Sequence, residues 1–187
     1  MRGYFGVGVE GVSKHMNAGS LFRTAHAFGA SFLFTIGAAY SRAEGGLADT
    51  SDAGGAVPYY EFSGPRDLRV PEGCSLVAVE IAEDAVDLPR FRHPHCAAYV
   101  LGPERGHVSG ELVELADSVV KIPTRFAINL AIAGAIVMYD RLISTRRFGD
   151  RPIMPGAAVE PSPPHVFGEP LWRRRLAERG AREEGRG

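Results

Sequence analysis

Short apolar runs alternate with helical segments along the first three quarters of the chain, and this alternation constrains the fold more than any other feature. Residues 4–9 form an apolar run typical of a buried strand. The segment NAGSLFRTAHAFG then predicts a helix, with Asn17 as its N-cap and Gly29 as its stop. A second apolar run covers residues 31–36. This strand, helix and strand predict an α/β fold with a mostly parallel sheet flanked by helices.

The same alternation continues to residue 144. We expect a capped helix in SGELVELAD and a buried helix in NLAIAGAIVMYDRLI, which is apolar nearly all round. Residues 37–55, rich in Gly, Ala, Ser and Asp, predict a long, mobile surface loop. Further strands are expected at residues 57–62, 75–80, 96–101 and 118–122.

Composition bounds the partners and the compartment. The chain has 21 basic and 22 acidic side chains, so bulk charge alone does not hold it to nucleic acid, and any RNA site must be local. Cys74 and Cys96 form no CxxC pair, and no apolar stretch reaches the length of a membrane span. We therefore expect a cytoplasmic protein without a membrane partner, with one domain over residues 1–144 and a Pro- and Arg-rich tail over residues 145–187.

Three segments carry polar residues and glycines where predicted strands run into helices: residues 17–23, 101–106 and 122–129. The carboxyl ends of parallel strands meet at one edge of a sheet, where loops expose free backbone amides and helix N-termini. The three segments are therefore expected to form one ligand site.

These segments resemble the motifs of a known family. NAGSLFRTAHAFGA resembles NxGxxxRxAxxFGA, and YVLGPERGHVSGELVELAD resembles LVLGxExxGLSxELLxxAD. KIPTRFAINLAIAGAIVMYD is similar to a closing motif in which a proline precedes Ser-Leu-Asn and a helix of small residues. In this order the motifs are similar to those of the SpoU, or TrmH-like, family of the SPOUT superfamily of RNA methyltransferases. Two departures concern the third motif: the segment between proline and asparagine is shorter, and Ala127 replaces the common serine.

The resemblance implies S-adenosylmethionine as cofactor and RNA as substrate, with methyl transfer to a ribose 2'-hydroxyl. It also implies a C-terminal deep trefoil knot and a homodimer whose active site lies near the subunit interface. Because no RNA-binding domain precedes the first strand, the chain looks like the short form of the family, whose members act mostly on tRNA.

The resemblance assigns roles to individual residues and requires no metal. Arg23 is expected to stabilise the developing alkoxide and to bind phosphate, since a guanidinium that stays protonated is a poor general base. Asn17, Glu104 and Asn129 complete the expected catalytic group. The expected cofactor-binding residues are Leu101, Gly102, Glu104, Gly106, Ile122, Ala127, Asn129 and Leu130.

Simpler interpretations stand beside these roles. Asn17 and Asn129 each have the residue type of a helix N-cap, and Glu104 could be a solvated surface acid. His93 and His95 flank a proline without a clear third ligand, so we interpret them as a loop pair and expect no metal site.

Two other functions remain open at this point. One is methylation of ribosomal RNA, and the other is an RNA-binding protein that keeps the fold but has lost transfer, which the altered third motif would permit. A nucleotide-binding dehydrogenase is disfavoured because no GxGxxG follows the first strand.

Overall fold

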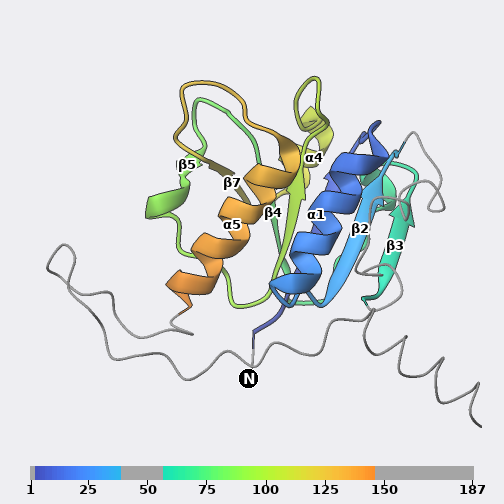
Figure 1. The fold of residues 1–187 in the computed structure, drawn as a ribbon, viewed down its shortest axis with the longest axis horizontal. Coiled ribbons are helices and arrows are strands. Elements are labelled where there is room, and N and C mark those ends of the chain that lie inside the picture. The colour runs from blue at the N-terminus through green and yellow to red at the C-terminus, as the bar shows by residue number, and fades with distance from the viewer. Residues whose placement is uncertain (1–2, 39–56, 146–187) are drawn as a thin grey trace, which may run out of the picture. The chain divides into compact units, whose positions relative to one another are not determined.

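Seven strands form one sheet in the computed structural model, which describes residues 3–38 and 57–145. The strand order is β3-β2-β1-β6-β4-β7-β5, and every neighbouring pair is parallel. This arrangement confirms the predicted α/β fold (Figure 1). The strands are β1 (Phe5–Glu10), β2 (Phe32–Ile36), β3 (Tyr59–Phe62), β4 (Ser75–Val79), β5 (Val86–Asp87), β6 (Ala97–Leu101) and β7 (Ser118–Lys121).

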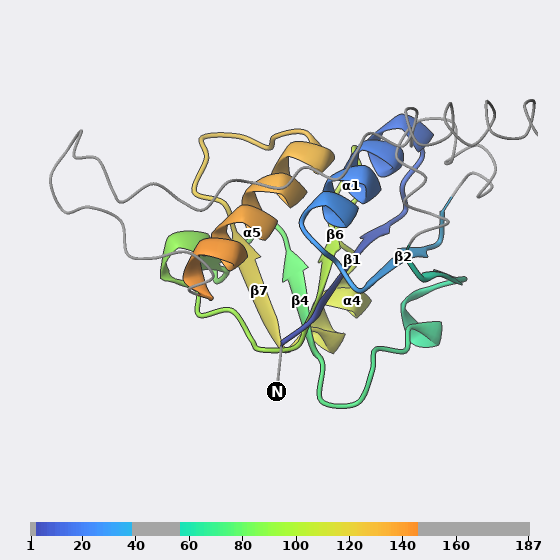
Figure 2. The same ribbon diagram turned by 60° about the horizontal axis from the view of Figure 1, so that its bottom comes forward.

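Helices cover both faces of the sheet. Figure 1 shows α1 and α5 side by side on one face, and Figure 2 shows α4 on the opposite face. No helix in the described ranges has the length and apolar character that a bilayer span requires. The helices are α1 (His15–Ala27), α4 (Gly110–Leu115) and α5 (Leu130–Ser144), with single 3-10 turns η1 (Pro65–Asp67) and η2 (Leu88–Arg90).

Each strand supplies side chains to two separate cores, because successive residues of a strand point to opposite faces. Tyr99 of β6 packs under α1 and α5, whereas its neighbour Val100 packs with Leu112 of α4. The central strands β1 and β6 are almost fully buried. They therefore read as continuous apolar runs, as expected for parallel strands covered on both faces.

α1 and α5 approach each other closely at Gly134. A Cβ atom at this position would collide with the Leu21 side chain of α1. The close contact holds the first turns of both helices at one edge of the sheet, next to the carboxyl ends of the strands.

Most elements agree with the sequence prediction, and three differ from it. α1 begins at His15 with Lys14 as N-cap, so the prediction that Asn17 caps this helix was wrong. The two-residue strand β5 was missed because so short a segment carries no periodicity. α5 is not buried all round, since Ile132, Ile136 and Tyr139 are exposed.

Arg141 anchors the last turns of α5 to the end of the sheet where β1 and β6 begin, opposite the carboxyl ends of the strands. Its guanidinium is buried and donates hydrogen bonds to the carbonyl oxygens of Pro94 (2.6 Å), His95 (2.8 Å) and Tyr4 (3.3 Å), and to the Tyr99 hydroxyl (3.1 Å). Burial raises the pKa of Tyr99 to about 12, although Arg141 opposes this shift. The tyrosine is therefore a neutral partner of the arginine at any physiological pH.

His93 belongs to the same buried group. Its ring nitrogens contact the Tyr99 hydroxyl at 2.6 Å and the Asp140 carboxylate at 2.9 Å. Burial lowers the pKa of His93, although the hydrogen bond with Asp140 works in the other direction. The ring is therefore neutral, and its contacts with Tyr99 and Asp140 join β6 to α5.

Some predictions concern residues outside the described ranges. They are most of the loop over residues 37–55 and the tail after residue 145. The domain limit at residue 144 and the trefoil knot also stay predictions.

Candidate functional site

The loops that follow β1, β4, β6 and β7 gather at one edge of the sheet and enclose a cavity of about 380 Å³. Small-molecule sites commonly have this size and lie at this edge of a parallel sheet. The structure brings all the predicted cofactor-binding residues together there. The cavity is lined by Leu101, Gly102, Glu104, Gly106, Ile122, Ala127, Asn129 and Leu130, and also by Asn17.

Asn17 connects the three motif segments through its side-chain amide. Its Nδ2 donates a hydrogen bond to Oε1 of Glu104 at 3.0 Å. Its Oδ1 accepts a hydrogen bond from Nδ2 of Asn129 at 3.2 Å. Asn17 therefore uses both the NH₂ group and the oxygen of its amide to join α1 to the loop after β6 and to the start of α5. These two contacts explain why a residue inside the first turn of α1 needs this side chain.

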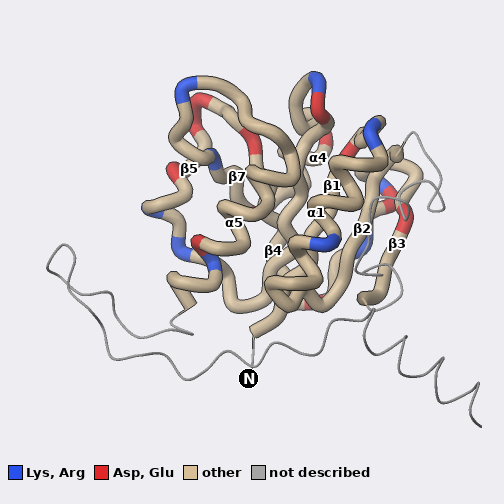
Figure 3. Tube along the Cα trace, viewed as in Figure 1, with Lys and Arg blue, Asp and Glu red and all other residues tan. Residues whose placement is uncertain are grey.

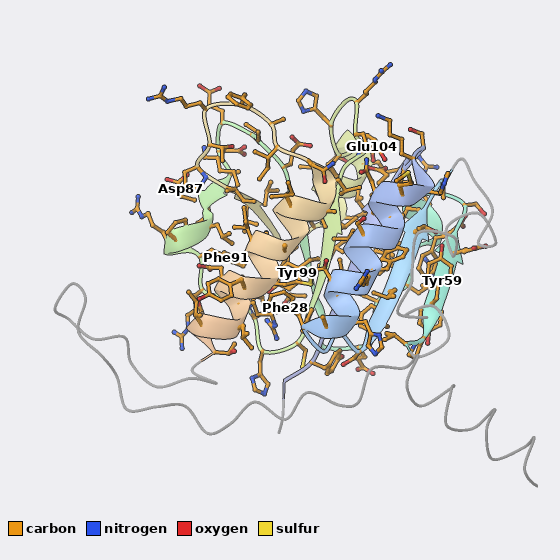
Figure 4. The ribbon with its side chains drawn as sticks, viewed as in Figure 1. Phe28, Tyr59, Asp87, Phe91, Tyr99 and Glu104 are labelled. Atoms are coloured by element: carbon orange, nitrogen blue, oxygen red, sulfur yellow. The ribbon has the colours of Figure 1, made fainter. Side chains whose placement is uncertain are left out.

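Glu104 turns away from solvent toward the start of α1, at the upper end of the molecule in Figure 4. Besides the Asn17 amide, its carboxylate accepts hydrogen bonds from the backbone N–H groups of Ser13 (3.3 Å) and Lys14 (3.2 Å). A carboxylate at this end of a helix also interacts favourably with the helix dipole. Burial works to raise the pKa of Glu104, but these hydrogen bonds outweigh it and lower the pKa. The acid is therefore ionised at neutral pH and ties the loop after β6 to α1.

Asn129 combines the two roles that its residue type allows. Its Oδ1 accepts hydrogen bonds from the backbone N–H groups of Ala131 (2.9 Å) and Ile132 (3.4 Å), so it is the N-cap of α5. Its Nδ2 is the donor to Asn17. The start of α5 is thereby fixed against the start of α1.

Two acids that the sequence analysis missed hold the loop over residues 102–109. Glu10 accepts a hydrogen bond from the Ser109 backbone N–H at 2.7 Å. Glu80, which lines the cavity, accepts from the Val108 N–H at 2.7 Å and contacts the His107 ring at 3.1 Å. Glu10 is the last residue of β1 and Glu80 directly follows β4, and this position at the carboxyl end of a buried strand was the signal that could have found them.

The backbone at Gly102 bends too tightly for a side chain. A Cβ atom there would lie 2.9 Å from the backbone nitrogen of Val108. Gly106 in the same loop has a φ of +115°, a conformation that favours glycine. The glycines of the second motif segment are therefore required by the loop shape, which places the backbone next to the cavity.

Arg23 is not among the residues that line the cavity. It is exposed on α1, six residues after Asn17, and therefore faces a different side of the helix. His93 lies in the buried group beside Tyr99, apart from the cavity. Within residues 3–38 and 57–145, no three His, Cys, Asp or Glu side chains are grouped as a metal site would need.

One curated relative, whose name states its activity, matches more than half of this chain. This chain is 27% identical over 139 residues to the tRNA (guanosine(18)-2'-O)-methyltransferase TARBP1 of Mus musculus. The match covers 69% of this chain and 9% of that protein. The chain thus spans a small part of this curated relative.

Two solved structures have the same fold. The AdoMet-bound rRNA methyltransferase of Sinorhizobium meliloti is 24% identical with a TM-score of 0.67, over 76% of this chain and 57% of that one. A structure described by the 2-OH methylation of C/U34 on tRNA is 21% identical with a TM-score of 0.65, over 78% of this chain and 98% of that one.

The family assignment follows from a match that includes every element around the cavity. The family model described as SpoU rRNA Methylase matches residues 5–139, which is well over half of the chain. This range contains β1 through most of α5, and with them the three joined motif segments. The chain therefore belongs to the SpoU rRNA methylase family.

Proposed function

We propose that this protein is an S-adenosylmethionine-dependent RNA methyltransferase that methylates a ribose 2'-hydroxyl of tRNA. The observation that carries this proposal is the cavity, where Asn17 joins Glu104 and Asn129 by hydrogen bonds of 3.0 and 3.2 Å. The tRNA activity in the name of the mouse relative supports the tRNA substrate. The structure described by the 2-OH methylation of C/U34 on tRNA, of which the match covers 98%, supports it as well.

The residues around the cavity fit the proposed cofactor, which supplies an activated methyl group on a sulfonium. Ile122 and Leu130 offer apolar surface suited to an adenine ring. Gly102 lines the cavity, and its missing side chain lets the backbone of Val108 pack against it, which keeps the loop after β6 folded beside the cavity. The carboxylate of Glu80 lies at the cavity and is suited to accept hydrogen bonds from ribose hydroxyls.

In the proposed reaction the protein aligns the acceptor hydroxyl with the methyl group, and the hydroxyl proton passes to a neighbouring phosphate or to water. Arg23 has the chemistry to stabilise the oxygen as negative charge develops and to bind the neighbouring phosphate. Because it does not line the cavity of its own chain, we place it in the active site of a second copy in a homodimer.

The exposed apolar side of α5 supports a homodimer. Ile132, Ile136 and Tyr139 are spaced four and three residues apart and share one side of the helix. Their exposed fractions are 56%, 37% and 50%. A self-complementary two-fold interface would bury these side chains beside α1.

Methylation of ribosomal RNA is the second candidate, favoured by the description of the family and by the S. meliloti relative. One assay separates the two: transfer of radiolabelled methyl from S-adenosylmethionine to tRNA or to ribosomal RNA, followed by digestion to nucleosides. We expect a 2'-O-methyl nucleoside from tRNA with the native protein and none with Arg23→Ala. A protein that binds the cofactor and labels neither RNA would be the inactive RNA-binding member considered above.

The same assay tests the shared active site. Arg23→Ala keeps the cavity, and Ala127→Trp fills it but keeps the arginine, so each variant alone should be inactive. After equal mixing and exchange of subunits, half of the dimers are mixed, and each has one complete site if Arg23 acts across the interface. Activity should return to about a quarter of the native level. If the mixture stays inactive although mixed dimers form, Arg23 acts within its own chain.

A further inference from the structure

Phe126 is the most exposed large apolar side chain in the described part of the chain, with an exposed fraction of 75%. It lies in the loop between β7 and α5, whose neighbouring residues Thr124, Ala127 and Ile128 line the cavity. Single exposed apolar residues are common on protein surfaces, so exposure alone carries no function. The position of this ring beside the cavity, and not its exposure alone, indicates a role in binding.

Two hydrogen bonds within the loop hold the backbone that carries the aromatic ring. The Thr124 hydroxyl donates to the carbonyl oxygen of Phe126 at 2.9 Å, and the Thr124 backbone N–H donates to the carbonyl oxygen of Ile122 at 2.7 Å. The backbone on both sides of the ring is thereby fixed next to the cavity. A ring on such a loop can receive a partner with little loss of conformational freedom.

Exposed basic side chains lie on this loop and on two other segments that line the cavity. Arg125 precedes Phe126 and is exposed, and Arg105 is exposed in the loop after β6. Figure 3 shows basic positions on both of these loops and at the start of α1, which supplies Lys14. The exposed acids Glu83 and Asp84 follow β4 on the side of β5. A polyanion would therefore approach over α1 and the loop after β6.

The acids nearest to the cavity keep their negative charge, but their carboxylates are bound to backbone N–H groups rather than to the exposed arginines. Glu10, Glu80 and Glu104 direct their carboxylates to backbone N–H groups of Ser109, Val108 and Lys14. The exposed residues at the ends of these loops include Arg105 after β6, and Arg125 and Phe126 after β7. This combination suits single-stranded nucleic acid, in which bases stack on aromatic rings and phosphates contact arginine.

We propose that Phe126 is a stacking platform for a base of the substrate RNA, adjacent to the nucleotide whose ribose enters the cavity. Arg125 and Arg105 contact the phosphates on either side of that base. This inference rests on the proposed function, because it assumes that RNA is the molecule brought to the cavity. It identifies a specificity element in the third motif segment, where the chain departs from the family pattern.

The test compares substitutions that separate aromatic stacking from apolar character. Binding of bulk tRNA and of ribosomal RNA is measured directly, beside cofactor affinity and sedimentation of the protein. Phe126→Ala and Phe126→Leu should weaken binding of the preferred RNA between about 5-fold and 100-fold, whereas Phe126→Trp should stay near native. Cofactor affinity should change less than about twofold in all of them. Tyr60→Ala, an exposed aromatic on β3 away from the cavity, is the matched control.

Electrostatic contacts have a separate signature. Arg125→Gln should reduce the dependence of log affinity on log salt by about one unit of slope, as expected for one lost phosphate contact.

Several results would overturn the proposal that Phe126 stacks on a base of the RNA. RNA binding by Phe126→Leu at the native level would show that no stacking occurs, and dissociation of a dimer by Phe126→Ala would identify a second copy as the occupant. A parallel loss of cofactor affinity would make the ring part of the cofactor site. Because binding is measured without turnover, a protein that binds RNA through Phe126 but transfers no methyl would contradict only the proposed function.

Discussion

Asn17 lies beside the other motif residues at the cavity, but the local structure predicted for it was wrong. Its residue type and its place after an apolar strand suggested an N-cap, yet α1 begins two residues earlier and Lys14 has the cap position. The helix start has no side-chain cap, and Glu104 from a distant loop accepts hydrogen bonds from the N–H groups of Ser13 and Lys14, just before the first helical residue. A contact between residues about 90 positions apart has no local sequence signal.

Glu104→Gln should weaken the joint between α1 and the loop after β6. The glutamine presents an NH₂ group to donors that now face a carboxylate, so we expect a loss of about 1 kcal/mol in the free energy of unfolding at pH 7. Because the folded pKa of Glu104 is lowered, its contribution is present above the ordinary value of 4.5 and is lost as the pH falls through the folded pKa.

Chemical denaturation at pH 7 and at about pH 3 measures this difference, with the exposed Glu114→Gln as control. The difference between native protein and Glu104→Gln should narrow at the lower pH. A gap that stays constant with pH would mean that the charge of Glu104 does not fasten the loop.

Among the elements, α5 shows what periodicity could and could not predict. Its length and its N-cap at Asn129 were expected, because a capping residue precedes a long apolar run. Its exposed side was not expected, since Ile132, Ile136 and Tyr139 are as apolar as the buried positions. Arg141, which looks like a surface residue near a helix end, is 6% exposed and bound to carbonyl groups from two other segments.

Arg141→Lys should destabilise the fold although it keeps the charge. A lysine cannot reach the four acceptors with a planar fork, so buried carbonyl oxygens are left without donors. We expect the free energy of unfolding to fall by about 2 to 4 kcal/mol in urea denaturation. Arg92→Lys on the exposed side of the same region should change it by less than about 0.5 kcal/mol. Equal effects of the two substitutions would contradict the anchoring role of Arg141.

At the scale of the whole molecule, strand order brings the site together. Residues 17–23, 101–106 and 122–129 are far apart in the chain, but β1 and β6 are neighbours, and β4 lies between β6 and β7. Because all these strands are parallel, the loops after them meet at one edge, as the sequence analysis expected. The strand order itself depends on long-range pairing and could not be predicted from local patterns. Arg23 does not line the cavity of its own chain, and only the proposed homodimer would bring it to the cavity of a second copy.

Calorimetric titration with S-adenosylmethionine measures whether the cavity at the carboxyl ends of the strands binds the methyl donor. The native protein should bind one cofactor per chain. Ala127→Trp, which fills the cavity, should lower the affinity at least about tenfold, whereas Ala27→Trp at the far end of α1 should leave it unchanged. Native affinity in Ala127→Trp, or no binding by the native protein, would contradict the account.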